Sequence, residues 1–77
     1  RIALCIIRFA DEQGVIQNGK VSITKTPIQQ DIANMAGTSR ETVSRALGLL
    51  EKEDLIERHG RELTILNYKN FIKEFDS

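Results

Sequence analysis

The sequence predicts a small α+β domain that is mostly α-helical. Apolar residues recur at helical spacing in four segments, and short stretches of alternating apolar and polar residues lie between them. Turns that contain glycine separate these segments. With 77 residues, of which 40% are hydrophobic and 29% charged, the chain has a globular composition and room for a single domain, residues 1–77.

Composition excludes several classes of function. Cys5 and His59, the single cysteine and histidine, supply neither a disulfide framework nor a zinc site, and no catalytic set of histidine, carboxylate and nucleophile can be assembled. The longest apolar run, Ile2 to Ile7, is far shorter than the roughly 20 residues of a membrane span. We therefore expect no enzyme, no metal, no cofactor in this domain, no membrane partner and a cytoplasmic location. Because the chain starts without Met inside a predicted helix, we also expect a fragment of a longer protein.

The first third of the chain predicts a helix followed by a turn and a strand. Ile2, Ile6 and Phe9 recur at helical spacing, which favours an amphipathic helix over residues 1–13 that Gly14 ends. The segment 15–20 contains an Asn-Gly pair and predicts a turn or hairpin tip, and the alternation that follows predicts a short strand over 21–24.

A second helix is expected to begin at the Thr-Pro pair that follows this strand. Thr26 can cap a helix, Pro27 suits its first position, and Gln29 completes a capping box. This helix is expected to run to about Met35 and to end near Gly37.

The remaining elements follow in short order. Ser39 offers an N-cap for a helix from Arg40 to about Glu53, and Asn67 offers one for a last helix. We expect a strand over 55–58, a tight turn over 59–61, a returning strand over 62–66 and a helix over 68–75. In that last helix, Phe71, Ile72 and Phe75 are expected to pack rather than to function, and Cys5 is expected in the core.

Residues 29–48 predict two helices that meet at a short turn. Ala33 falls on the inner face of the first helix, where a larger side chain would push the second helix away, and Val43 packs back from the second helix. Gly37 supplies the left-handed conformation that the turn requires. This spacing is typical of a helix-turn-helix, although it also occurs in ordinary helical hairpins.

The second of these helices divides into two faces. At about 100° per residue from Arg40, the residues Glu41, Ser44 and Arg45 fall with Arg40 inside an arc of roughly 140°. We call these four residues the polar arc. Apolar residues occupy the opposite side of the helix: Val43, Ala46, Leu47 and Leu50.

The polar arc has the chemistry that reads base edges. Arginine donates two hydrogen bonds to guanine, glutamate accepts from cytosine, and serine serves either partner. The arc lies in the first turns of its helix, which is the part of a recognition helix that enters the major groove. A merely solvated face would carry the same residue types. The following hairpin favours DNA, because His59, Gly60 and Arg61 at its tip would form a wing with a cation near phosphate. The predicted fold is thus a winged helix-turn-helix.

Charge is balanced overall but unevenly distributed. Eleven Lys and Arg residues match eleven Asp and Glu residues, which is not the footprint of a basic nucleic-acid binder. Residues 20–49 nevertheless carry an excess of two positive charges, whereas residues 50–57 carry four acids against Lys52. Modest electrostatic attraction predicts weak nonspecific binding and a need for paired half-sites.

At these residues the sequence resembles the C-terminal winged-helix domain of the Crp–Fnr family of bacterial transcription regulators. The resemblance covers roughly residues 1–66, and its most specific part is the segment 38–45, TSRETVSR. Ile28 stands where many members have a Ser or Thr cap. The matching motifs are DIANMAGTSRETVSRAL (31–47), Leu50-Glu51, Leu55-Ile56 and His59-Gly60-Arg61.

The resemblance implies roles for individual residues. It implies that Arg40, Glu41 and Arg45 contact base edges with Ser44 beside them, and that Glu41 and Arg45 read the G·C pair of a TGA-type half-site. For Thr42, which lies off the polar arc, a hydrogen bond back to its own helix is the alternative. The residues that match phosphate-contacting positions in the family are Gln30, Ser39, Thr42, His59 and Arg61.

The resemblance also implies partners. Double-stranded DNA with an inverted repeat would be bound by a homodimer of the intact protein, whose N-terminal effector-binding domain would precede Arg1. Contact with RNA polymerase is a family-level expectation. The alternative function is a winged helix that makes protein–protein contacts without binding DNA, which would tolerate loss of Arg45.

Overall fold

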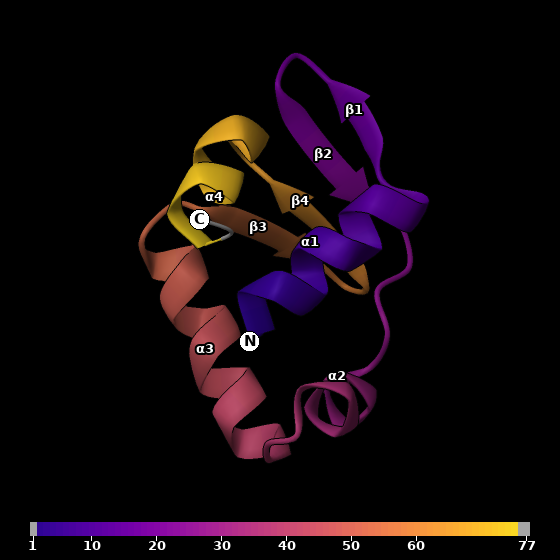
Figure 1. Cartoon of the computed structure of the whole chain (residues 1–77), viewed down its shortest axis with the longest axis vertical. Coiled ribbons are helices and arrows are strands. Elements are labelled where there is room, and N and C mark those ends of the chain that lie inside the picture. The colour runs from indigo at the N-terminus through magenta and orange to yellow at the C-terminus, as the bar shows by residue number, and fades with distance from the viewer. Residues whose placement is uncertain (1, 76–77) are drawn as a thin grey trace.

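The computed structural model describes residues 2–75, which form four helices and one antiparallel sheet (Figure 1). The predicted α+β, mostly α-helical winged helix-turn-helix is confirmed, while residues 1, 76 and 77 lie outside the described part. The elements are α1 (Ile2–Gln13), β1 (Val15–Gln17), β2 (Lys20–Ile23), α2 (Gln29–Ala36), α3 (Arg40–Lys52), β3 (Ile56–His59), β4 (Glu62–Ile65) and α4 (Tyr68–Phe75).

The first hairpin contains one strand that the sequence did not predict. Asn18 and Gly19 both have positive φ, 53° and 79°, and join Gln17 to its partner Lys20, as a two-residue turn of type I′ does. The predicted turn is therefore confirmed. All three residues of β1 are exposed, so this strand lacks the alternation of buried and exposed residues by which a strand is recognised.

The two hairpins of the chain share one sheet with the strand order β1-β2-β4-β3. β2 pairs with β4, which places Ser22 opposite Thr64 and joins their hydroxyl oxygens by a hydrogen bond of 3.1 Å. β3 and β4 form the wing, whose base is consequently anchored in the sheet rather than standing alone.

Gly14 allows α1 to turn directly into β1. A Cβ at this position would lie 2.4 Å from the carbonyl oxygen of Ala10 and 2.4 Å from a methyl carbon of Val21. Because one contact is to backbone and the other to a core residue, a side chain here would push α1 away from β2.

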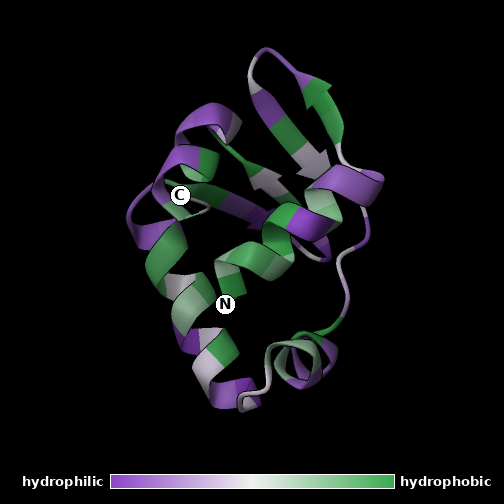
Figure 2. Cartoon of the chain, in the orientation of Figure 1, coloured by the Kyte–Doolittle hydropathy of each residue, from purple (hydrophilic) through white to green (hydrophobic). Residues whose placement is uncertain are grey.

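The core lies between the helices and the inner face of the sheet. Phe71 is fully buried, and its ring centroid lies 4.8 Å from that of Phe75, so the predicted packing role of these residues is confirmed. Figure 2 shows the hydrophilic colour of the first turn of α3, which lies at the far end of the molecule from the first hairpin. The buried apolar residues are Ile6, Ile7, Phe9, Ala10, Val21, Ile23, Ile32, Ala33, Ala36, Val43, Leu47, Leu50, Ile56, Leu63, Ile65 and Phe71.

The predicted start of the second helix is wrong. α2 begins at Gln29, and Ile28 occupies the cap position without a side-chain hydrogen bond. The capping box does not form because Thr26 turns its hydroxyl to the carbonyl of Arg61, 2.7 Å away. A contact distant in sequence has displaced the local one.

Other boundaries shift by about one residue. β3 is 56–59 and not 55–58, because the amide of Leu55 donates to the carbonyl of Leu50 at the end of α3. His59 accordingly ends a strand rather than lying in the turn. α3 ends at Lys52 with Glu53 as its C-cap. Asn67 caps α4 as predicted, through a bond of 3.1 Å from the amide of Asn70.

Candidate nucleic-acid interface

α2 and α3 form the predicted helix-turn-helix. Ala33 and Val43 are both fully buried where the helices approach one another. Gly37 ends α2 in the left-handed conformation, with φ of 68°, and the amide of Thr38 then donates to the carbonyl of Ala33 at 2.9 Å. This hydrogen bond caps the C-terminal end of α2 and directs the chain into α3.

Ser39 caps α3 as the sequence predicted. Its hydroxyl oxygen accepts a hydrogen bond of 3.2 Å from the amide of Thr42 and lies 2.9 Å from the hydroxyl oxygen of Thr42. The two hydroxyl groups share one hydrogen bond, so one of the two O–H groups remains available to donate elsewhere. Thr42 therefore bonds to Ser39, the capping residue of its own helix. This contact is similar to the alternative given for Thr42 above, a hydrogen bond from its hydroxyl back to the helix.

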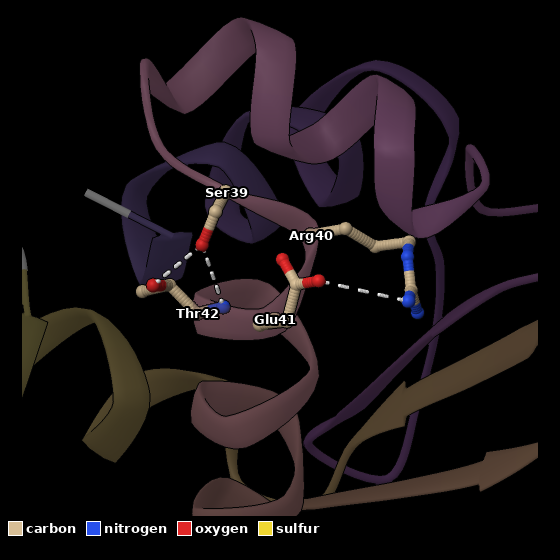
Figure 3. Close-up of polar contacts among 4 residues, drawn as sticks. All are labelled: Ser39, Arg40, Glu41 and Thr42. Carbon is tan, nitrogen blue, oxygen red and sulfur yellow. Dashed lines mark hydrogen bonds and ion pairs between the residues drawn. The ribbon is translucent and has the colours of Figure 1, made fainter.

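The four residues of the polar arc are all exposed. Arg40 and Glu41 form a loose ion pair of 3.9 Å, with about 56% and 71% of their side chains exposed. In Figure 3 these two side chains extend to one side of the first turn of α3, whereas Ser39 and Thr42 lie on the other. The ion pair is weak because solvent screens it, so both groups remain available to a ligand.

The wing places His59 and Arg61 at the tip of the β3–β4 hairpin. His59 pairs with Glu62 in the ladder, and Gly60, with φ of 60°, holds the first position of the two-residue turn between them. The Nε2 atom of His59 lies 4.0 Å from a carboxylate oxygen of Glu57 on the same strand, and both side chains are largely exposed.

Arg61 and Thr26 hold each other through four hydrogen bonds, which we call the wing clamp. The amide and the hydroxyl of Thr26 donate to the carbonyl of Arg61 at 2.9 and 2.7 Å. In return, Nε and Nη2 of Arg61 donate to the carbonyl of Thr26 at 3.0 and 2.7 Å. The sequence did not indicate this pair, whose members lie 35 positions apart.

A second tie joins the wing to the recognition helix. Nη2 of Arg58 on β3 donates to a carboxylate oxygen of Glu51 on α3 at 2.6 Å, and both side chains are about one-third exposed. This hydrogen bond holds the pKa of Glu51 below its usual range, and burial offsets the effect only in part. The sequence did not indicate this pair, whose members lie seven positions apart on different elements.

The predicted site residues occupy three elements. Gln30 is exposed on α2, where its amide donates to the side-chain oxygen of Asn34 at 3.1 Å. The polar arc with Ser39 and Thr42 lies on the first half of α3, and His59 and Arg61 lie on the wing. Within residues 2–75 no group of His, Cys, Asp and Glu side chains could hold a metal ion, and no helix there is long and apolar enough to cross a membrane.

The family model and the curated relatives that this chain matches indicate the same family. The family model described as the Crp-like helix-turn-helix domain matches residues 1–73. A curated relative, the cAMP-activated global transcriptional regulator CRP of Pasteurella multocida, is 32% identical over 72 residues, covering 77% of this chain and 34% of the relative. The probable transcriptional regulator flp of Lacticaseibacillus casei is 43% identical over 49 residues, covering 64% of this chain and 22% of the relative.

The solved structures agree with the sequences. The CO-dependent transcription factor CooA from Carboxydothermus hydrogenoformans superposes with a TM-score of 0.83 at 29% identity, over 100% of this chain and 35% of that chain. The present chain therefore spans about a third or less of the proteins it matches. These relatives are transcription regulators and not enzymes. The chain belongs to the Crp-like helix-turn-helix family, the DNA-binding domains of CRP/FNR-type transcription regulators.

Proposed function

We propose that this domain binds double-stranded DNA in a sequence-specific manner, with α3 in the major groove of a TGA-type half-site. One observation carries the proposal: the polar arc is exposed on the capped first turns of the second helix of a helix-turn-helix. That region of a recognition helix meets base edges, and its residue types are those that hydrogen-bond to them.

Within the polar arc, Arg45 and Glu41 read the G·C pair of the half-site. The arginine donates to guanine and the glutamate accepts from the amino group of cytosine. Arg40 and Ser44 contact neighbouring base edges. The loose ion pair between Arg40 and Glu41 supports this assignment, because a contact of 3.9 Å between exposed groups exchanges readily for contacts with DNA.

Phosphate contacts frame the polar arc on both sides. Gln30 on α2 and His59 and Arg61 on the wing reach the backbone, and they add affinity without adding sequence preference. Ser39 and Thr42 contribute the O–H group that their shared hydrogen bond leaves over.

The intact protein is proposed to bind an inverted repeat as a homodimer. Two half-sites then lie about 34–36 Å apart on one face of the duplex. The single domain 1–77 carries the DNA-binding function, while an N-terminal domain of the longer, cytoplasmic protein binds an effector. Contact with RNA polymerase belongs to that whole protein.

A binding titration tests the proposal. The chain, fused to a dimerising coiled coil, is titrated against a labelled duplex with inverted TGA-type half-sites and against a scrambled duplex of equal composition, at stated salt. We expect the specific duplex to bind at least about a thousandfold more tightly. Equal binding of both duplexes by a folded chain would contradict the proposal and favour a winged helix that contacts protein.

A further inference from the structure

We propose that Arg61 is a positioning residue that fixes the wing before any DNA is present. Its effect on DNA binding rests on the function proposed above, whereas its effect on the wing does not. In this assignment one edge of the guanidinium binds the carbonyl of Thr26, and the other edge remains available to bind a phosphate.

The geometry of the wing clamp supports this role. Nε and Nη2, which form one edge of the guanidinium, both point to the carbonyl oxygen of Thr26. The carbonyl of Arg61 accepts from the amide and the hydroxyl of the same threonine. Each residue thus donates two hydrogen bonds and receives two, which fixes the relative orientation of the two backbones as well as their separation.

The clamp joins the tip of the wing to the segment that precedes α2. Gly60 has no side chain, and beyond the strand ladder the hydrogen bonds found at the wing tip among residues 2–75 are those of the clamp, while the bond from Arg58 to Glu51 ties the wing to α3 further from the tip. On the other side, α2 starts at Gln29, and its cap residue Ile28 provides no side-chain hydrogen bond. Because Thr26 lies two residues before this cap position, the clamp places the start of α2 as well as the wing tip. Both flank the polar arc and carry proposed phosphate contacts.

The clamp requires arginine in particular. A guanidinium presents two N–H groups on one rigid edge, whereas the lysine ammonium is a single rotatable point charge on a flexible stem. Arg61→Lys therefore keeps the charge that a phosphate senses and loses the two-pronged contact with Thr26. This substitution separates the positioning role from a purely electrostatic one.

The first measurement uses the chain without DNA. Backbone amide order parameters at Thr26 and Gly60 are expected to be about 0.85 in the original chain and below about 0.6 in both Arg61→Lys and Arg61→Ala. Thr26→Val replaces only the hydroxyl, with a methyl group. Its order parameters should lie between those of the original chain and those of the two Arg61 variants. Lys25→Ala is the matched control, because Lys25 is an exposed cation next to Thr26 that makes no hydrogen bond or ion pair with the described residues. Its order parameters should not change.

The second measurement titrates the same variants, as coiled-coil fusions, with the inverted-repeat duplex at several salt concentrations. Arg61→Lys is expected to bind about three- to tenfold more weakly with an unchanged salt slope. Arg61→Ala should bind more weakly still and lose about 0.9 from the slope, as one phosphate contact disappears. Thermal unfolding confirms that each variant is folded.

Two results would overturn the inference. One is an Arg61→Lys chain whose wing order matches that of the original chain; the other is an Arg61→Lys chain with lower order but unchanged affinity for the specific duplex. If neither the original chain nor any variant prefers the specific duplex, the proposed function fails. The order parameters measured without DNA still decide whether the clamp exists.

Discussion

Arg45 lies in the second turn of α3, where its side chain is exposed and makes no hydrogen bond or ion pair with any described residue. We predict that Arg45→Ala lowers specific DNA affinity by about 1–3 kcal/mol and relaxes the preference at one base pair, because the guanine loses its bidentate partner. Measured affinities for a panel of single-base variants of the half-site check this.

Arg8 on α1 provides the control for that substitution. It is an exposed arginine outside α2, α3 and the wing. Arg8→Ala should leave the order of preference among the half-site variants unchanged. A uniform loss of affinity in Arg45→Ala, the same for every duplex, would instead assign Arg45 to phosphate.

Glu51 gives the domain a dependence on acid. Because hydrogen bonding to Arg58 lowers its pKa in the folded chain, the stabilisation is complete above the unfolded-state pKa of about 4.3 and is lost as the pH falls through the lower folded-state value. We predict that Glu51→Gln is less stable than the original chain at pH 7 by about 0.2–1 kcal/mol, given the exposure of the pair.

Urea unfolding from pH 7 to pH 3 tests this prediction. The stability difference between Glu51→Gln and the original chain should shrink as the pH falls through the lowered pKa of Glu51 and its carboxylate becomes protonated. The control is Glu53→Gln, because Glu53 is an exposed glutamate nearby that forms no ion pair with an arginine among the described residues. A difference that persists unchanged into acid would contradict the role of the ion pair.

At the scale of elements, α3 contains one residue that weakens it. Gly48 lies inside the helix, and a Cβ built there meets no atom within 4 Å apart from the adjoining backbone of its own helix. Alanine has the higher helix propensity and restricts the unfolded chain more, so Gly48→Ala should stabilise the domain by about 0.4–1 kcal/mol. Thermal unfolding should show a rise of roughly 2–8 °C. A lower melting temperature would contradict this prediction, because it would mean that the added methyl group clashes or strains the helix.

The elements also show how far a sequence can be interpreted by its local patterns. The caps at Ser39 and Asn67 could be predicted, because each cap bonds to an amide three residues away. The capping box at Thr26 could not be excluded by the same reasoning. Its competitor, Arg61, lies 35 residues away, and nothing in the local spacing indicates the pairing. Strand β1 was missed for a related reason, since its exposed residues owe their pairing to β2.

For the molecule as a whole, the face that carries the polar arc was predictable and the scaffold behind it was not. A helical period places Arg40, Glu41, Ser44 and Arg45 together from sequence alone, and their exposure agrees with that placement. The ties between Thr26 and Arg61 and between Glu51 and Arg58 required the tertiary structure. They join the wing to the loop before α2 and to α3, so that the three elements proposed to contact DNA are held as one unit.

The proposed symmetric dimer sets the spacing between half-sites. Two half-sites separated by one helical turn lie on the same face of the duplex, where both domains of one dimer can bind. We predict that inserting about half a helical turn between the half-sites of the inverted repeat removes most of the affinity gained from dimerisation, since it places the second site on the opposite face. Titration of the coiled-coil fusion against both duplexes measures the loss. Equal affinity for the two would contradict binding by paired domains.

Selection of bound sequences from a random duplex pool is the most direct test of sequence-specific recognition. The chain is fused to a dimerising coiled coil, and the selection is run at stated salt in parallel with the Arg45→Ala variant. We predict that the original chain enriches an inverted repeat of TGA-type half-sites, and that the variant loses the preference at the G·C pair assigned to Glu41 and Arg45. A folded chain that enriches no sequence above background would contradict the account and assign this winged helix to protein contacts.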